Sequence, residues 1–127
     1  MRSKVMDGIR RVMVVEDEVM LLLDLVENLA DFGIESLPLM MADGAARTLC
    51  KSDIDALITD IELPGNNSGL DLAWRCAQLK PSMPIVVVSG GVRPTRSQLP
   101  PNAIFVPKPY DIQQILDGLD RRMQRAA

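Results

Sequence analysis

Four short runs of apolar residues, rich in β-branched side chains and uninterrupted by polar ones, occur along the chain. Strands that are buried on both faces of a sheet have this pattern, whereas strands with one exposed face alternate apolar and polar residues. The predicted strands are Val12 to Val15, Ala56 to Ile58, Ile85 to Val88 and Ile104 to Val106, with Ile34 to Leu39 as a weaker candidate. Such strands require a covering layer on each face of the sheet.

Amphipathic helices are predicted between the strands, where apolar residues recur at spacings of three and four. The clearest extends from Glu18 to Phe32. Another begins at Ile112, and its apolar stripe continues to Met123. Shorter patterns predict helices from Asp43 to Lys51 and from Gly69 to Lys80, the latter with Leu70, Ala73, Trp74 and Ala77 facing inward. Strands and helices therefore alternate along the chain.

This alternation predicts an α/β fold, a doubly wound five-stranded parallel sheet with right-handed crossovers and helices on both faces. The stretch from Gly90 to Pro101 interrupts the alternation, because it is polar and contains three prolines. We therefore expect the fourth helix to be short or irregular, between Pro94 and Leu99.

Composition excludes several classes of function. The chain has 127 residues, of which 47% are apolar, enough for one domain with a hydrophobic core. It has no histidine, which excludes a Ser-His or Cys-His nucleophile and a His-ligated zinc or haem within this chain. The net charge is −3 and no long basic run occurs, so nucleic-acid binding is not expected.

The cellular compartment is predicted from what the sequence does and does not contain. The start lacks the apolar stretch of a signal peptide, and no run approaches the roughly 20 apolar residues of a membrane span. We therefore expect a cytoplasmic protein that does not enter a membrane. Cys50 and Cys76 match no CxxC spacing and are expected to be small buried thiols in a reducing compartment.

Residues with reactive groups follow four of the predicted strands. In an open parallel sheet, ligands bind beyond the carboxyl ends of the strands, so these residues would meet at one edge. Glu16 and Asp17 follow the first strand, Asp60 the third, Ser89 the fourth and Lys108 the fifth.

Each of these residues alone has an ordinary explanation as a helix cap, a turn residue or a solvated charge. Together, Glu16, Asp17 and Asp60 would place three negative charges at one edge, and such charges repel one another unless a cation holds them. Lys108 supplies one positive charge, and a single divalent cation would balance the remaining two. Mg²⁺ is the predicted cofactor, because it accepts a few carboxylate or carbonyl oxygens and keeps several waters.

This ordered set of residues resembles the receiver domain of two-component response regulators. The resemblance is carried by Val14-Val15-Glu16-Asp17-Glu18, by Asp60 with Leu63-Pro64 after it, by Ser89 and by Lys108-Pro109. It extends from about Arg11 to Arg122, so we expect an N-terminal extension at residues 1–10 and a receiver domain at residues 11–127. It implies a flavodoxin-like fold with the strand order 2-1-3-4-5.

The resemblance also implies a phosphorylation site. Asp60 would accept a phosphoryl group from a histidine of a partner protein, since this chain has no histidine. Asp17 and Asp60 would bind Mg²⁺ directly, and the backbone carbonyl of Glu62 would be a further ligand. Glu16 would act mainly through a metal-bound water. The ion would offset the charge of the transferring oxygens.

A conformational switch is implied as well. Ser89 and Lys108 would contact oxygens of the phosphoryl group, and Ser89 would move toward it. Phe105 on the fifth strand would rotate into the vacated space and, lacking a hydroxyl, would act through packing alone. Pro109 is a candidate for a cis peptide bond that aims Lys108 into the site.

Three departures from the family pattern bear on this site. The loop from Ile61 to Ser68 is slightly longer than the commonest form, and the stretch between the fourth and fifth strands is shorter. Glu62 occupies a position where a side chain can help or hinder an attacking water, and the opposing position, Gly91, has no side chain. We therefore expect an unusual lifetime of the phosphoryl group.

The function implied by the resemblance is that of a stand-alone response regulator. It would receive its phosphoryl group from a histidine kinase or a histidine phosphotransfer protein, and catalyse only its own phosphorylation and dephosphorylation. It would signal by phosphorylation-dependent protein contact or pass the phosphoryl group onward. The sequence leaves its downstream partner and its oligomeric state open.

Three alternatives remain open at this point. The chain could be a degenerate receiver that binds partners without phosphorylation, or a receiver excised from a hybrid histidine kinase. A less favoured alternative is a phosphohydrolase with an aspartate nucleophile. Such enzymes generally have a second aspartate two residues after the nucleophile, where this chain has Glu62.

Overall fold

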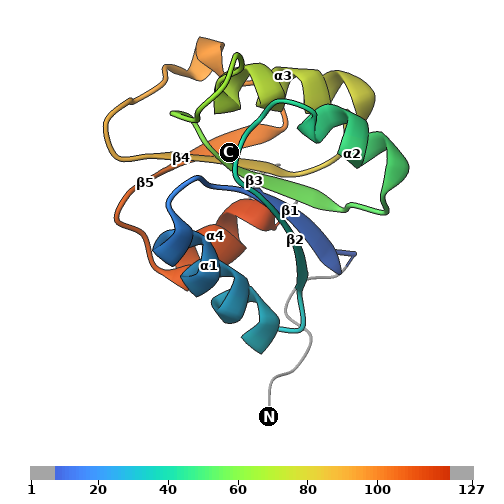
Figure 1. Ribbon diagram of the computed structural model, residues 1–127, viewed down its shortest axis with the longest axis vertical. Coiled ribbons are helices and arrows are strands. Elements are labelled where there is room, and N and C mark those ends of the chain that lie inside the picture. Colours follow the sequence, from blue (N-terminus) through green and yellow to red (C-terminus); the bar gives the residue numbers. More distant parts are fainter. Residues whose placement is uncertain (1–7, 121–127) are drawn as a thin grey trace.

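The computed structural model describes residues 8–120 and consists of a parallel sheet between two layers of helices (Figure 1). The strands are β1 (Arg11–Val15), β2 (Glu35–Leu39), β3 (Ala56–Asp60), β4 (Ile85–Ser89) and β5 (Ala103–Pro107). All neighbouring strands pair in parallel, in the order β2-β1-β3-β4-β5. The predicted α/β fold, the strand order and the weaker strand prediction are thereby confirmed.

Two helices cover each face of the sheet (Figure 1). On one face lie α1 (Val19–Asp31) and α4 (Ile112–Leu119), and on the other α2 (Ala45–Lys51) and α3 (Gly69–Leu79). The predicted continuation of the last helix to Met123 lies outside the described residues. Within residues 8–120, no helix combines the length and the hydrophobicity that crossing a membrane requires.

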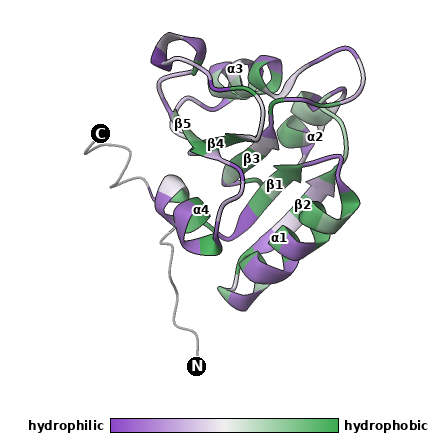
Figure 2. Cartoon of the chain, turned by 90° about the vertical axis from the view of Figure 1, so that its left-hand side faces the viewer, coloured by the Kyte–Doolittle hydropathy of each residue, from purple (hydrophilic) through white to green (hydrophobic). Residues whose placement is uncertain are grey.

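The strands carry apolar side chains on both faces because both faces are covered. In β1, Val12 and Val14 pack with α1 and α4, whereas Met13 and Val15 pack with α2 and α3. Figure 2 shows β1 and β4 in mainly hydrophobic colours, while α1 carries both kinds of residue. Burial of one such side chain contributes roughly 1.5–3 kcal/mol, so these two apolar clusters stabilise the strand ends that carry the site.

The segment between β4 and β5 contains one short helical element, the 3₁₀ helix η1 (Arg96–Gln98). This confirms the short or irregular helix expected between Pro94 and Leu99. The indole Nε1 of Trp74 in α3 donates a hydrogen bond of 2.8 Å to the Gln98 carbonyl. The Arg96 guanidinium donates to the carbonyls of Pro101, at 3.1 Å, and Ala103, at 2.8 Å. These bonds hold the segment against α3 and the start of β5.

The predicted inward face of α3 is confirmed for Ala73, which is buried, and for Leu70 and Ala77, which pack against the apolar cluster beneath α2 and α3, but it is wrong for Trp74. Gly69, Leu72 and Cys76 are also buried. Trp74, predicted to face inward, is 41% exposed. The reason is the close approach of Gly69 to β3. A Cβ atom at that position would lie 1.7 Å from the Asp60 carbonyl oxygen, so the glycine faces the sheet and sets the rotation of the helix.

The cysteines differ in their environments. Cys76 is buried in α3, as predicted, and burial raises the pKa of its thiol to about 11. Cys50 is exposed on α2, so its predicted burial is wrong. The short helix α2 buries only Ala45 and Leu49, and the following position faces outward.

Candidate functional site

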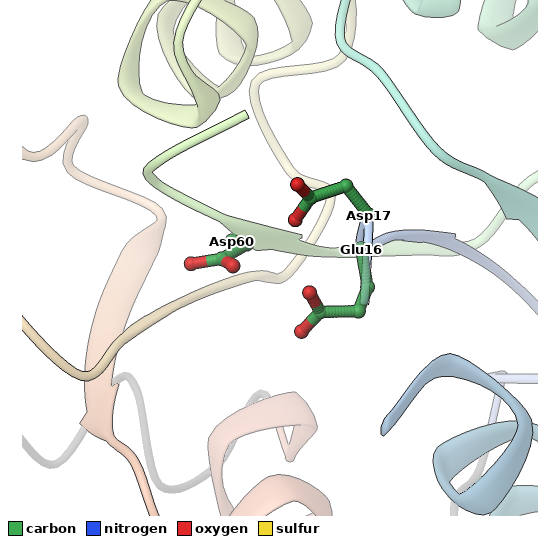
Figure 3. A group of neighbouring side chains, drawn as sticks. All are labelled: Glu16, Asp17 and Asp60. Carbon is green, nitrogen blue, oxygen red and sulfur yellow. The ribbon is translucent and has the colours of Figure 1, made fainter. Parts of the chain in front are cut away.

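Three carboxylates meet at the carboxyl edge of the sheet. Glu16 and Asp17 directly follow β1, and Asp60 is the last residue of the neighbouring strand β3. One carboxylate oxygen from each residue lies within 4.8 Å of the others. Figure 3 shows how the three side chains lie at this edge. Glu16 and Asp60 are buried, whereas Asp17 is exposed.

Lys108 connects two of these carboxylates. It follows β5, and its Nζ donates to Glu16 Oε1 at 2.8 Å and to Asp60 Oδ2 at 3.0 Å. The peptide bond between Lys108 and Pro109 is cis. Burial disfavours the charged ammonium, but the hydrogen bonds to Glu16 and Asp60 outweigh it and raise the pKa of Lys108. The side chain therefore remains a cation at neutral pH.

Glu16 is held from two sides. Its Oε1 accepts from Lys108, and its Oε2 accepts the backbone N–H of Glu18 at 3.0 Å. Burial raises the pKa of the Glu16 carboxyl, and these two hydrogen bonds oppose the rise. Asp17, by contrast, makes no hydrogen bond or ion pair within residues 8–120. Its carboxylate is therefore available to a ligand.

The arrangement fits a hard divalent cation. Three carboxylates and one ammonium leave a formal charge of −2 at this edge, and no other cationic side chain pairs with them in the described part of the chain. Carboxylate oxygens are the ligands that Mg²⁺ prefers, with water filling the other positions. Glu16, Asp17 and Asp60 are the side chains that could hold such an ion.

Ser89 ends β4 at the same edge and is buried. Its Oγ accepts the backbone N–H groups of Gly91, at 3.2 Å, and Val92, at 2.9 Å. The structure provides no acceptor for the hydroxyl proton among residues 8–120. The hydroxyl proton is therefore available to a bound group.

Phe105 and Tyr110 flank the site on β5 and just beyond it. Phe105 is half-buried and packs against the apolar cluster beneath α2 and α3. Tyr110 packs against the cluster beneath α1 and α4, and burial, followed by the negative charge of Glu16, raises its pKa to about 12. The sequence pattern does not point to Tyr110, apart from its place next to Lys108-Pro109.

Two other residues singled out in the sequence lie beside each other. Glu62 is exposed just after β3, and its Oε1 lies next to Gly91. A Cβ atom added at Gly91 would come within 3.2 Å of that oxygen. The bare backbone at Gly91 therefore leaves room for the Glu62 carboxylate.

A further carboxylate, which the sequence pattern did not indicate, contacts the loop after Asp60. Asp43 was predicted only as the start of a helix, but α2 begins at Ala45 and Asp43 precedes it in the loop from β2. Its carboxylate accepts hydrogen bonds from Asn66 and Asn67, which are 23 and 24 residues away along the chain. No local pattern could have indicated such a contact.

A surface cavity of about 830 Å³ lies away from the acidic edge, between α2 and α3. Its lining includes Arg47, Cys50 and Trp74, and none of the acidic residues of the site. The reactive groups therefore do not belong to this cavity.

Comparisons with known proteins agree with the fold. The sequence matches the family described as "Response regulator receiver domain" over residues 12–120. No curated protein matched the chain.

Among solved structures, the chain is similar to a response regulator receiver protein from Sinorhizobium medicae WSM419. The sequence identity is 26% and the TM-score 0.82, over 93% of this chain and 96% of the other. A receiver domain protein from Clostridium thermocellum has 21% identity and a TM-score of 0.79, over 93% and 97% of the two chains. A sensor protein from Polaromonas sp. JS666 has 24% identity and a TM-score of 0.77, over 93% and 98%. The last two likenesses concern the fold alone.

Proposed function

Because this chain belongs to the response regulator receiver domain family, we propose that Asp60 accepts a phosphoryl group from a phosphohistidine of a partner protein. The observation that carries the proposal is the meeting of Glu16, Asp17 and Asp60, with Lys108 bonded to two of them. The chain has no histidine, so the donor histidine belongs to another molecule, a histidine kinase or a histidine phosphotransfer protein. The reaction would take place in the cytoplasm.

In the proposed transfer, a carboxylate oxygen of Asp60 attacks the phosphorus atom. A new O–P bond forms, the P–N bond to the donor imidazole breaks, and the imidazole nitrogen keeps the electron pair. Lys108 pairs with a phosphoryl oxygen, and Ser89 donates its hydroxyl proton to another. Positioning and charge stabilisation of this kind are most of what phosphoryl transfer requires of a protein.

Mg²⁺ is the proposed cofactor. Asp17 and Asp60 would hold it directly, together with the backbone carbonyl of Glu62, and Glu16 would act mainly through a metal-bound water. The ion would offset the negative charge on the oxygens of the transferred group. The donor set and the formal charge of −2 at the edge support this assignment.

The proposed signal passes through Ser89 and Phe105. On phosphorylation, Ser89 moves toward the phosphoryl group and Phe105 turns into the vacated space on β5. The output is a phosphorylation-dependent protein contact or onward transfer of the phosphoryl group. Glu62, beside Gly91, sets the access of water and hence the lifetime of the phosphoryl group.

The proposal predicts that a small phosphodonor such as acetyl phosphate phosphorylates Asp60 in the presence of Mg²⁺. Intact-mass spectrometry measures the reaction. Wild-type protein should gain one phosphoryl group with Mg²⁺ and none with EDTA, and Asp60→Asn should gain none. Asp53→Asn, which changes an exposed aspartate outside the site, is the matched control and should react as wild type does.

Each alternative gives its own result in the same experiment. No Mg²⁺-dependent adduct on the wild-type chain would contradict the proposal and favour a degenerate receiver. Rapid, repeated turnover of a phosphate ester, without accumulation of the adduct, would favour a phosphohydrolase. Labelling that persists in Asp60→Asn would show that another residue is the acceptor.

A further inference from the structure

The loop between β3 and α3 is anchored at its two ends by backbone hydrogen bonds. Ile61 donates its N–H to the Val88 carbonyl at 3.0 Å, and its own carbonyl accepts the N–H of Gly69 at 2.8 Å. A capping box between Ser68 and Asp71 then starts α3. The ends of the loop are therefore continuous with the sheet and the helix.

Residues 62–67 between these anchors have a single hydrogen-bonding partner in the described part of the chain. That partner is the Asp43 carboxylate, in the loop between β2 and α2. It accepts the Asn66 N–H at 3.2 and 3.1 Å, the Asn67 N–H at 3.0 Å, and the Asn67 side-chain amide at 3.1 Å. One carboxylate thus binds three N–H groups of this loop.

The backbone at Gly65 allows this close contact. Gly65 has φ +95°, and a Cβ atom there would lie 2.9 Å from Asp43 Oδ2. The hydrogen bonds that Asp43 accepts lower the pKa of its carboxyl, and the bond from the Asn66 N–H contributes most. The carboxylate therefore stays an acceptor at neutral pH. Leu63 adds an apolar contact with the cluster beneath α2 and α3. The loop is therefore shaped by Asp43 at its tip and by Leu63 nearer the strand.

We propose that Asp43 is a positioning residue of the phosphorylation site, which holds the loop after Asp60 in the shape that presents the Glu62 backbone carbonyl to Mg²⁺. The inference rests on the proposed function, because Glu62 is a metal ligand only there. Asp43 itself touches neither the metal nor the phosphoryl group. It acts by removing conformational freedom from residues 62–67, which have no other hydrogen bond to the rest of the described chain.

The test compares Asp43→Ala and Asp43→Asn with Asp53→Ala, a control that removes an exposed carboxylate outside the loop. Mg²⁺ binding is measured by calorimetry on unphosphorylated protein. We expect Asp43→Ala to weaken Mg²⁺ binding about tenfold, as loss of a group that orients a metal ligand typically does. Asp43→Asn keeps one carbonyl oxygen as acceptor and should recover part of the affinity, and Asp53→Ala should bind as wild type does.

Amide hydrogen exchange in the metal-free protein supplies a second readout. Asn66 and Asn67 should lose protection in Asp43→Ala but not in Asp53→Ala. Unchanged Mg²⁺ affinity in Asp43→Ala, with wild-type protein binding Mg²⁺ normally, would overturn the inference, even where the variant is less stable. Failure of wild-type protein to gain a phosphoryl group on Asp60 would instead count against the proposed function, so the two failures are distinguishable.

Discussion

Lys108 sets the charge balance at the edge of the sheet. It comes from the opposite end of the chain to Glu16, 92 residues away, and its ammonium bonds both Glu16 and Asp60. With one carboxylate oxygen of each acid bonded to the lysine, Asp17 is left as the exposed member of the group. Lys108 thus holds two of the three carboxylates, and the third faces outward.

At the residue scale, the switch proposal predicts a specific loss in Phe105→Ala. The variant should still be phosphorylated on Asp60, because Phe105 does not contact the reacting groups in the proposed mechanism. It should lose the changes in amide NMR shifts that phosphorylation causes in residues 90–102, since no ring is left to move. These shifts, recorded with and without phosphodonor, are the measurement.

Ile104→Ala is the matched control for this prediction. Ile104 precedes Phe105 on β5, is also half-buried, and packs on the opposite face of the sheet. Both variants lose apolar packing, but only Phe105→Ala should lose the response. A response of Phe105→Ala equal to that of wild-type protein would mean that Phe105 is an ordinary core residue.

At the scale of the elements, the position of α3 depends on a close contact with Asp60. Its first residue, Gly69, lies against the carbonyl of Asp60, and no side chain fits between them. The capping box of Ser68 and Asp71 fixes the helix start at the same place. The rotation of α3, and with it the exposure of Trp74, follows from this contact.

Gly69→Ala should therefore damage both stability and the site. A Cβ atom at 1.7 Å from a backbone oxygen cannot be accommodated without moving α3 or the end of β3. We expect a loss of about 3 kcal/mol in the free energy of unfolding, measured by urea denaturation, and slower phosphorylation of Asp60.

Gly90→Ala tests whether that effect is due to the contact. Gly90 follows β4 near the same edge, but an added Cβ atom would meet only the Lys108 Cβ at 3.7 Å, an ordinary contact distance. Its stability should stay close to that of wild-type protein. Equal losses in the two variants would show that the close approach of Gly69 to Asp60 is not what matters.

At the scale of the whole molecule, three groups that titrate at alkaline pH bind their protons more tightly in the folded chain. Burial raises the pKa of Cys76 from an ordinary 9.0 to about 11 and that of Tyr110 from 10.0 to about 12. The pKa of Lys108 is raised by its hydrogen bonds to Glu16 and Asp60, against the effect of burial. As the pH rises, the unfolded chain releases these protons first, so stability falls with pH.

The free energy of unfolding should therefore decrease between pH 9 and pH 11, by on the order of 2 kcal/mol from Cys76 alone. Urea denaturation at several pH values measures the slope. Cys76→Ala lowers stability at every pH by leaving a cavity, but its slope between pH 9 and 10 should be shallower. Cys50→Ala, at the exposed cysteine, removes only the smaller charge contribution to the Cys76 pKa and should keep most of the wild-type slope. A slope in Cys76→Ala equal to that of wild-type protein would contradict the prediction.

The sequence by itself determined the strands, most of the helices and the set of reactive residues. Uninterrupted apolar runs can be read locally, because a strand covered on both faces needs apolar residues at successive positions. The residues after each run were identifiable for the same reason, since the carboxyl ends of parallel strands meet at one edge. Glu16, Asp17 and Asp60 lie together as that argument predicted.

Only the tertiary structure decided how these parts contact one another. The exposure of Trp74 depends on the approach of Gly69 to Asp60, and the loop after Asp60 is hydrogen-bonded to Asp43. The first is the packing of a helix against a strand, and the second is a contact between segments that lie far apart in the sequence. Local periodicity indicates that a helix has an apolar side, but the neighbouring backbone fixes its rotation. Likewise, the positioning role proposed for Asp43 depends on folding, which brings a loop 24 residues away to its carboxylate.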